Sequence, residues 1–174
     1  DATNGSELLQ EVKAQTGIDI RIISGQEEAS YIYENHIAEN LDKTRSYLYI
    51  DVGGGSTELT LFSGTRLVFK ESFNIGTIRL LQQQVSDTTW QQMKDFLKQQ
   101  LKSIGPVTAI GSGGNINKIF SLSKRKEGKP LSLDLLKDYY KEFSNFTVEE
   151  RIHLYNLRED RADVIVPALQ IYVN

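Results

Sequence analysis

Cysteine is absent from this sequence, and methionine and tryptophan occur once each. The absence of cysteine excludes disulfides and thiol catalysis, and it makes the cytoplasm the default location. No apolar run approaches the ~20 residues that a membrane-spanning helix needs, and no signal peptide is visible, so no membrane partner is expected. The single methionine is Met93, so the chain has no initiator methionine and is interpreted as a fragment or a trimmed form.

Histidine is also scarce, since His36 and His153 are the only two. Neither has the spacing of a metal motif, and we interpret both as structural. The net charge of −3 argues against a nucleic-acid partner but leaves room for a local phosphate pocket. With 174 residues, 39% of them hydrophobic and 25% charged, the chain has the composition of a globular domain with its own core.

The stretch from Ser46 to Phe73 organises the rest of the chain. Its β-branched and aromatic runs predict three strands, at Tyr47–Ile50, Thr57–Phe62 and Arg66–Phe73. The last two strands are separated by a turn at Ser63-Gly64. The first two are separated by a run of glycines, and that glycine turn is the candidate site.

A glycine-rich turn between strands can direct several backbone N–H groups at one anion. The candidate phosphate ligands in this turn are Gly53, Gly54, Gly55 and Ser56. Asp51 and Glu58 flank them, and two carboxylates would repel a phosphate unless a cation stood between. Mg²⁺ suits that role, with Asp51 and Glu58 as its ligands. The alternative is a plain hairpin with solvent-facing acids, and the acid at each end makes the Mg²⁺–phosphate site the preferred interpretation.

The N-terminal residues predict a helix over 4–15 that stops at Gly17, a strand at Ile18–Ile23 and a helix from Ser24 to about His36. Ser24 and Glu27 have the spacing of a capping box. If Glu27 serves the helix start, Glu28 is free and points about 100° further round the helix. By itself Glu28 could simply be a favourable charge in the first turn.

The C-terminal half alternates helices with one more strand. We predict a helix capped by Asp87, a strand at Val107–Ile110, helices at 116–122 and 133–143, a capping box at Thr147-x-x-Glu150 and a last helix from about Ala162. Pro167 should kink that helix or mark its start. A helical stripe is predicted to pack in the core: Trp90, Met93, Leu97, Leu101 and Ile104.

Two further segments are candidate phosphate contacts. A glycine loop follows the strand at Val107–Ile110, and strand–glycine loop–helix is an arrangement that presents N–H groups to phosphate. Its candidate residues are Gly111, Ser112, Gly113 and Gly114, for which close packing is the alternative. Gly76 and Thr77 lie at another helix start, where free N–H groups favour anions. Arg79 in that helix is either a phosphate ligand or a structural contact.

The turn Asp51-Val-Gly-Gly-Gly-Ser-Thr-Glu58 resembles the second phosphate loop of the actin/Hsp70/sugar-kinase superfamily. Its Ser-Thr-Glu ending is similar to that of the exopolyphosphatase and guanosine pentaphosphate phosphohydrolase (Ppx/GppA) family. Four further segments match that family in its order: Ile23-Ser-Gly-Gln-Glu-Glu-Ala29, Asn74-Ile-Gly-Thr-Ile-Arg-Leu80, Ala109-Ile-Gly-Ser-Gly-Gly114 and Arg161-Ala-Asp-Val-Ile165. Together they span almost the whole chain.

The resemblance implies an α/β fold, an actin-like (ribonuclease H-like) domain with a mixed sheet flanked by helices. Residues 1–40 would be the closing helix–strand–helix of a first domain, and 41–174 a second domain without its last strand and helix. The first domain's own phosphate loop is not found. We therefore expect the chain by itself to be inactive, and to self-associate through Ile18–Ile23 or leave that segment disordered.

The resemblance implies a hydrolase that releases orthophosphate from inorganic polyphosphate or guanosine pentaphosphate, with Mg²⁺ as cofactor, Glu28 as catalytic base and a homo-oligomer, a dimer, as the assembly. Two alternatives stay open. One is a kinase or ATPase of the same superfamily. The other is a non-enzymatic module that binds guanosine tetra- or pentaphosphate.

Overall fold

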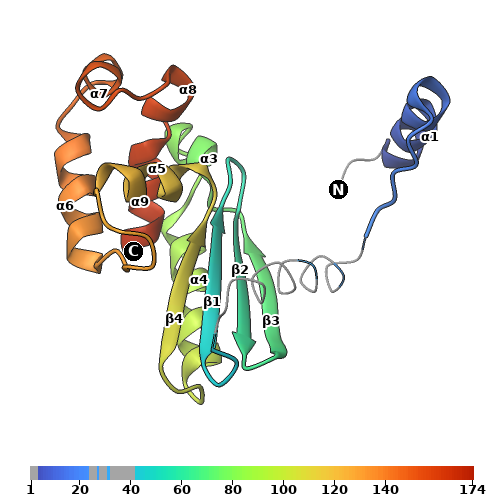
Figure 1. Cartoon of the computed structure of the whole chain (residues 1–174), viewed down its shortest axis with the longest axis horizontal. Coiled ribbons are helices and arrows are strands. Elements are labelled where there is room, and N and C mark those ends of the chain that lie inside the picture. Colours follow the sequence, from blue (N-terminus) through green and yellow to red (C-terminus); the bar gives the residue numbers. More distant parts are fainter. Residues whose placement is uncertain (1–3, 24–26, 28–30, 32–41) are drawn as a thin grey trace. The chain divides into compact units, whose positions relative to one another are not determined.

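The computed structural model describes residues 4–23, 27, 31 and 42–174. The chain divides into two compact units, residues 1–41 and 42–174 (Figure 1). Among the described residues, no helix is both long and apolar enough to cross a membrane. The assignment of residues 1–40 to a first actin-like domain stays a prediction.

In the first unit, helix α1 covers Gly5–Thr16, as predicted. It ends at Gly17, whose φ of 73° is the left-handed conformation that glycine adopts without strain, and whose N–H donates to the Lys13 carbonyl. The strand expected at Ile18–Ile23 is wrong, because these residues have no regular structure. A strand needs a hydrogen-bonded neighbour, and none lies beside this segment among the described residues. Self-association through it stays a prediction.

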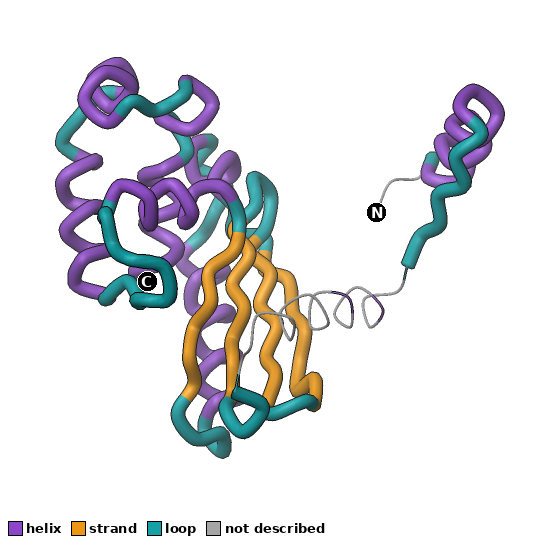
Figure 2. The backbone as a smooth tube through the Cα atoms, in the orientation of Figure 1, coloured by secondary structure: helices purple, strands orange, loops and turns teal. Residues whose placement is uncertain are grey.

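The second unit is built on a four-stranded sheet with the order β3-β2-β1-β4 (Figure 2). Its strands are β1 (Ser46–Val52), β2 (Thr57–Ser63), β3 (Arg66–Phe73) and β4 (Val107–Ser112). The three predicted hairpin strands and the later fourth strand are all confirmed. β1 runs antiparallel to β2 and parallel to β4, so the sheet is mixed. The glycine turn and the end of β4 therefore lie at the same edge of the sheet.

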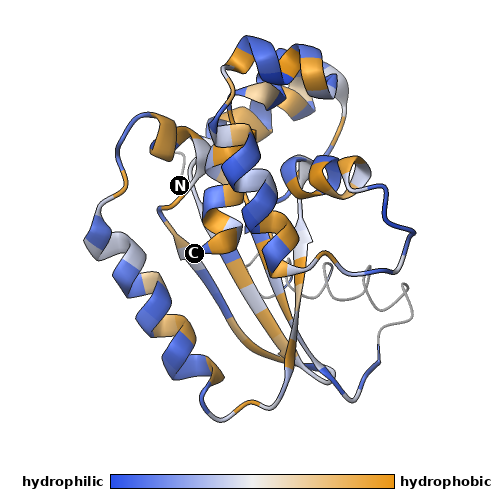
Figure 3. Cartoon of the chain, turned by 90° about the vertical axis from the view of Figure 1, so that its left-hand side faces the viewer, coloured by the Kyte–Doolittle hydropathy of each residue, from blue (hydrophilic) through white to orange (hydrophobic). Residues whose placement is uncertain are grey.

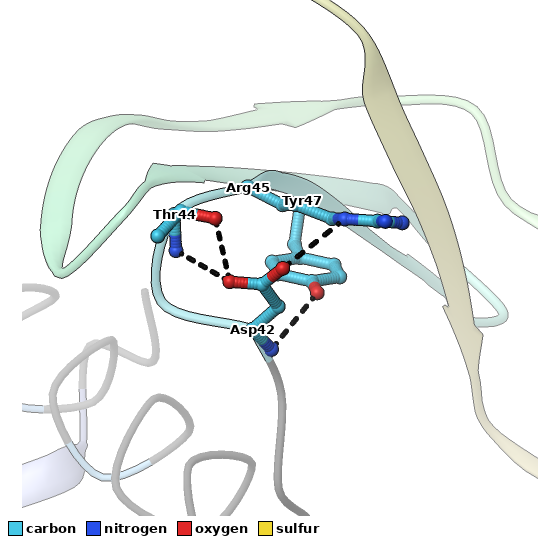
Figure 4. Close-up of polar contacts among 4 residues, drawn as sticks. All are labelled: Asp42, Thr44, Arg45 and Tyr47. Atoms are coloured by element: carbon cyan, nitrogen blue, oxygen red, sulfur yellow. Dashed lines mark hydrogen bonds and ion pairs between the residues drawn. The ribbon is translucent and has the colours of Figure 1, made fainter.

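A hydrogen-bonded turn leads into β1 (Figure 4). The Asp42 carboxylate accepts from the backbone N–H and the hydroxyl of Thr44, at 2.9 and 2.6 Å, and its other oxygen pairs with Arg45 at 3.3 Å. The Asp42 N–H donates to the Tyr47 hydroxyl. The Thr44 hydrogen bonds lower the pKa of Asp42 below its usual value. This local network fixes where the second unit begins.

Helices complete the second unit: α3 (Thr77–Leu81), α4 (Asp87–Leu101), α5 (Gly114–Leu122), α6 (Leu133–Ser144), α7 (Val148–Tyr155), α8 (Glu159–Ala162) and α9 (Ile165–Val173). Hydrophobic and hydrophilic residues alternate along them, as in amphipathic helices (Figure 3). One core joins the sheet to α4, and Met93 is buried in it, so the predicted stripe is confirmed as core packing. A second core lies among α5 to α9. α9 contributes to both cores.

The helix ends test the capping predictions. Asp87 is not the cap of α4, because the Ser86 side chain accepts from the Thr89 N–H and Asp87 is the first helical residue. The capping box of Thr147 and Glu150 is present at α7. Pro167 is the third residue of α9, within the first turn that a proline tolerates, so it marks a helix start as predicted.

Arg151 ties three elements of the second core together. Its guanidinium donates to the carbonyl groups of Phe143, Phe146 and Ala162, at 3.0, 2.8 and 2.6 Å. We expect Arg151→Met to lower the free energy of unfolding by about 3 kcal/mol, because three carbonyls lose a charged donor. Urea denaturation measures this. Arg158→Met is the control, since among the described residues the exposed Arg158 side chain pairs with Asp160 alone, and its loss should cost about 0.5 kcal/mol or less. Equal losses from the two variants would contradict the role of Arg151.

Candidate functional site

The glycine turn between β1 and β2 is closed by one hydrogen bond, from the Gly53 N–H to the Ser56 carbonyl at 2.9 Å. Gly53 is therefore not available as a phosphate donor through its amide, contrary to the expectation that the whole run cradles the anion. The amides of Gly54, Gly55 and Ser56 donate no hydrogen bond within the described part of the chain. Three consecutive free amides in a tight turn form the kind of concavity that binds anions.

Helix α3 packs its start against this turn. The Thr77 and Ile78 N–H groups donate to the Gly53 and Gly54 carbonyls, at 3.0 and 2.9 Å. The expectation that Thr77 presents a free N–H group to an anion is wrong, because that group donates to the Gly53 carbonyl. The same expectation for Gly76 stays a prediction. Gly76 is a glycine because of close approach: a Cβ there would lie 2.3 Å from the Gly54 carbonyl oxygen. The role of α3 is to support the loop.

The Arg79 side chain extends from α3 toward the same turn. Its Nε donates to the Gly55 carbonyl at 2.7 Å, which is a structural contact. Its two Nη groups have no hydrogen bond or ion pair within residues 42–174. The guanidinium is thus held at the loop through Nε, and its two Nη groups could donate to a ligand. Both sequence interpretations of Arg79, structural contact and phosphate ligand, are compatible with this geometry.

Asp51 and Glu58 face each other across the β1–β2 ladder, where they are directly paired. Asp51 is also paired with Ser112 on the other side, on β4. Directly paired residues point to the same face of a sheet, so both carboxylates and the Ser112 hydroxyl lie in one row. Like charges placed opposite each other destabilise a sheet. A cation between the two carboxylates would remove that cost.

The donor set of two carboxylates fits Mg²⁺ better than zinc or calcium. No group of three or more histidine, cysteine, aspartate or glutamate side chains that could hold a metal lies among the described residues. Zinc and calcium sites require more protein ligands than two carboxylates. Mg²⁺ is commonly held by one or two carboxylates together with substrate phosphates and water. Asp51, Glu58 and a phosphate bound at the adjacent amides would meet that requirement.

The second glycine-rich segment, at residues 111–114, contains a shorter loop than the sequence predicted. β4 continues through Ser112, and α5 begins at Gly114, so Gly113 alone joins them. Gly113 has φ 98°, which requires glycine, and a Cβ there would lie 3.4 Å from Asp51 Oδ1. Gly111 is explained by packing, since its Cβ position is 3.0 Å from Ile116 and 3.2 Å from the Tyr172 ring. Gly113 therefore brings the start of α5 beside Asp51.

Arg161 is a site neighbour that the sequence analysis did not identify. Its Nη1 donates to the Asn115 side-chain oxygen at 2.8 Å, and a Cβ on Gly114 would lie 2.5 Å from its Nη2. Asn115 is buried. The guanidinium therefore rests on the first turn of α5. The only signal in the sequence is the motif Arg161-Ala-Asp-Val-Ile165, which does not say where its arginine points.

Glu28, the predicted base, lies outside the described residues. Its neighbour Glu27 is helical and pairs with Arg21 at 3.1 Å. The structure therefore places Asp51, Glu58, the loop amides, Arg79 and Ser112–Gly114 around one edge of the second unit, and it says nothing of where Glu28 lies.

Residues 1–174 match the Ppx/GppA phosphatase family throughout. The chain belongs to this family. A putative exopolyphosphatase of Haemophilus influenzae is 27% identical over 187 aligned residues, covering 98% of this chain and 57% of that protein. A bifunctional 3-dehydroquinate synthase/phosphatase of Fusobacterium nucleatum is 32% identical over 114 residues, which cover 60% of this chain and 17% of that protein.

Solved structures show the same relationship. The Aquifex aeolicus Ppx/GppA family member has a TM-score of 0.73 at 26% identity, over 99% of this chain and 61% of that one. An exopolyphosphatase from Cytophaga hutchinsonii has a TM-score of 0.69 at 23% identity, over 98% of this chain and 62% of that one, and shows the fold alone. The expected α/β fold of actin-like type, with a mixed sheet flanked by helices, is confirmed. The chain spans less than two thirds of the length of these relatives.

Proposed function

We propose that the intact Ppx/GppA protein hydrolyses the terminal phosphoanhydride bond of inorganic polyphosphate or guanosine pentaphosphate and releases orthophosphate. The observation that carries the proposal is the loop at Gly54, Gly55 and Ser56, whose amides donate to no described residue, next to two carboxylates paired in the sheet register. A site of this kind binds a terminal phosphate together with a cation. The putative exopolyphosphatase among the relatives supports the substrate class.

Each part of the site has a role in this proposal. The loop amides bind the terminal phosphate and stabilise the charge that develops on its oxygens. Arg79, held by the Gly55 carbonyl, adds a fixed positive charge beside them. Asp51 and Glu58 would hold Mg²⁺, directly or through water, and the bound ion would neutralise phosphate charge. Ser112 and the amides at Gly113 and Gly114 contact the substrate from the β4 side.

Glu28 completes the proposal as the general base that takes a proton from the attacking water. A carboxylate in that role must lie within hydrogen-bond reach of a water that is in line with the leaving oxygen. Its assignment rests on the motif Ile23-Ser-Gly-Gln-Glu-Glu-Ala29, in which Glu28 is the second of two adjacent glutamates. The first of them, Glu27, pairs with Arg21.

The test is phosphate release from long-chain polyphosphate and from guanosine pentaphosphate with Mg²⁺, using the full-length parent protein beside the 174-residue chain. We expect release by the parent, loss of release with EDTA, and a loss of about a hundredfold or more in Asp51→Asn, since that variant removes a cation ligand. Asp87→Asn is the matched control, because Asp87 begins α4 outside the site.

The outcomes separate the candidate functions. Release by the parent names the preferred substrate. Binding of guanosine pentaphosphate without release, in the parent as well, would overturn the hydrolase proposal in favour of the regulatory module. Phosphate transfer from ATP to an acceptor other than water would favour the kinase alternative.

A further inference from the structure

Tyr172 on α9 reaches the edge of the sheet that carries the candidate site. Its hydroxyl donates to the Ser112 carbonyl at 3.1 Å and lies 3.5 Å from the Ile50 carbonyl. Ile50 and Ser112 belong to β1 and β4, the two parallel strands whose ends carry Asp51 and Gly113. One side chain from the last helix therefore contacts both strands where they enter the site.

Packing fixes the ring of Tyr172. A Cβ on Gly111 would lie 3.2 Å from Tyr172 Cε1, so the ring packs against β4 on the face opposite Asp51. The ring also forms one wall of an apolar pocket of about 390 Å³ between β4, α5 and α6. Burial and the negative charge of Asp51 raise the pKa of the Tyr172 hydroxyl well above its usual value. The hydroxyl thus remains a donor at neutral pH.

The hydroxyl contact has a consequence for the site. The Ser112 carbonyl directly precedes Gly113, the residue with φ 98° that turns the chain into α5. Gly113 in turn packs close to Asp51 Oδ1. If the Ser112 carbonyl moves, the spacing between Asp51 and the first amides of α5 changes. A phenylalanine would fill the same space but would leave that carbonyl without this donor.

We infer that Tyr172 is a positioning residue of the phosphate site: through the Ser112 carbonyl it sets the distance between Asp51 on β1 and the Gly113–Gly114 amides after β4. This inference rests on the proposed function of the site. In this way α9, which lies outside the phosphate loops, affects the spacing between the β1 side and the β4 side of the site. Substrate and Mg²⁺ contact the loop residues and not Tyr172 itself.

The test uses the 174-residue chain, labelled with ¹⁵N, and titrates it with tripolyphosphate in the presence of Mg²⁺. We expect Tyr172→Phe to weaken binding about three- to tenfold, as the loss of one hydrogen bond allows, and to shift the amide signals of Ser112 and Gly113 before ligand is added. Tyr155→Phe is the matched control. Its hydroxyl bonds Glu142 at 2.5 Å, among the helices of the second core, and its loss should change neither affinity nor those amide signals.

Either of two affinity results would overturn the inference. One is wild-type affinity in Tyr172→Phe. The other is an equal loss of affinity in Tyr155→Phe, which would mean that any lost hydroxyl softens the fold. If the wild-type chain binds no tripolyphosphate, the phosphate role of the loop in this chain fails instead. Tyr172 is then judged on the amide signals alone, and unchanged Ser112 and Gly113 signals in Tyr172→Phe overturn its positioning role.

Discussion

Replacing Gly76 by alanine is expected to destabilise the second unit and to weaken phosphate binding by the glycine turn. The added Cβ would lie 2.3 Å from the Gly54 carbonyl oxygen and 2.5 Å from the Gly54 and Gly55 carbonyl carbons, all backbone atoms. The effect is purely steric, because the backbone of Gly76, with φ −133° and ψ 163°, is open to any residue. Overpacking of this kind costs about 1–3 kcal/mol.

The glycine turn cannot move away from α3 without losing the hydrogen bonds that hold it there. The Thr77 and Ile78 N–H groups bond the Gly53 and Gly54 carbonyls, and Arg79 bonds the Gly55 carbonyl. Pushing α3 away therefore breaks these bonds and displaces the Gly54–Ser56 amides. We expect affinity for Mg²⁺ and tripolyphosphate to fall by about tenfold or more, since several charge-assisted hydrogen bonds are lost together. Urea denaturation and calorimetric titration measure the two effects.

Gly55→Ala is the matched control for stability. A Cβ at Gly55 would have nothing within 4 Å, so this variant should unfold at the wild-type urea concentration. The added methyl group would lie in open space at the loop. Any loss of tripolyphosphate affinity in Gly55→Ala would therefore come from steric obstruction of the bound anion. A Gly76→Ala chain with wild-type stability and wild-type affinity would contradict the support that α3 gives to the loop.

The sequence predicted the local features well. The strands of the hairpin were predictable because a run of β-branched and aromatic residues interrupted by glycines is a pattern of near neighbours. The capping box at Thr147 was predictable for the same reason, since both partners lie within one turn. The strand at Ile18–Ile23 failed because a strand also requires a neighbour, and a local pattern does not supply one.

The positions of the candidate residues in the hairpin were predictable, but their hydrogen bonds were not. Asp51 and Glu58 could be expected to flank the turn, and the hairpin register pairs them. The sequence did not predict that the Gly53 N–H donates to the Ser56 carbonyl. Nor did it predict that the Thr77 and Ile78 N–H groups of α3 donate to the loop carbonyls. Such partners depend on how the chain returns after β3. Tyr172 and Arg161 approach the site from 60 and 46 positions away, and no local pattern indicates that.

The largest loss of activity is expected from Glu28→Gln in the full-length parent. Glutamine keeps the size of the side chain but cannot accept a proton from water, so the general-base contribution, typically a factor of 10²–10⁴, should be lost. Binding should persist, because the proposed phosphate and cation ligands lie on other residues, at the glycine turn and at Asp51 and Glu58. We therefore expect kcat to fall while the affinity for Mg²⁺ and tripolyphosphate remains. Phosphate release and calorimetric titration of the same preparation separate the two quantities.

Glu27→Gln is the matched control, since it makes the same chemical change one residue earlier. Glu27 pairs with Arg21 at 3.1 Å, and the two side chains are 43% and 67% exposed. An exposed ion pair contributes little to stability, so the rate of Glu27→Gln should stay within about twofold of the wild type. A Glu28→Gln protein that keeps its rate would show that another group takes the proton. If Glu27→Gln instead loses the rate and Glu28→Gln keeps it, the two adjacent glutamates have the opposite roles, and Glu27 is the general base.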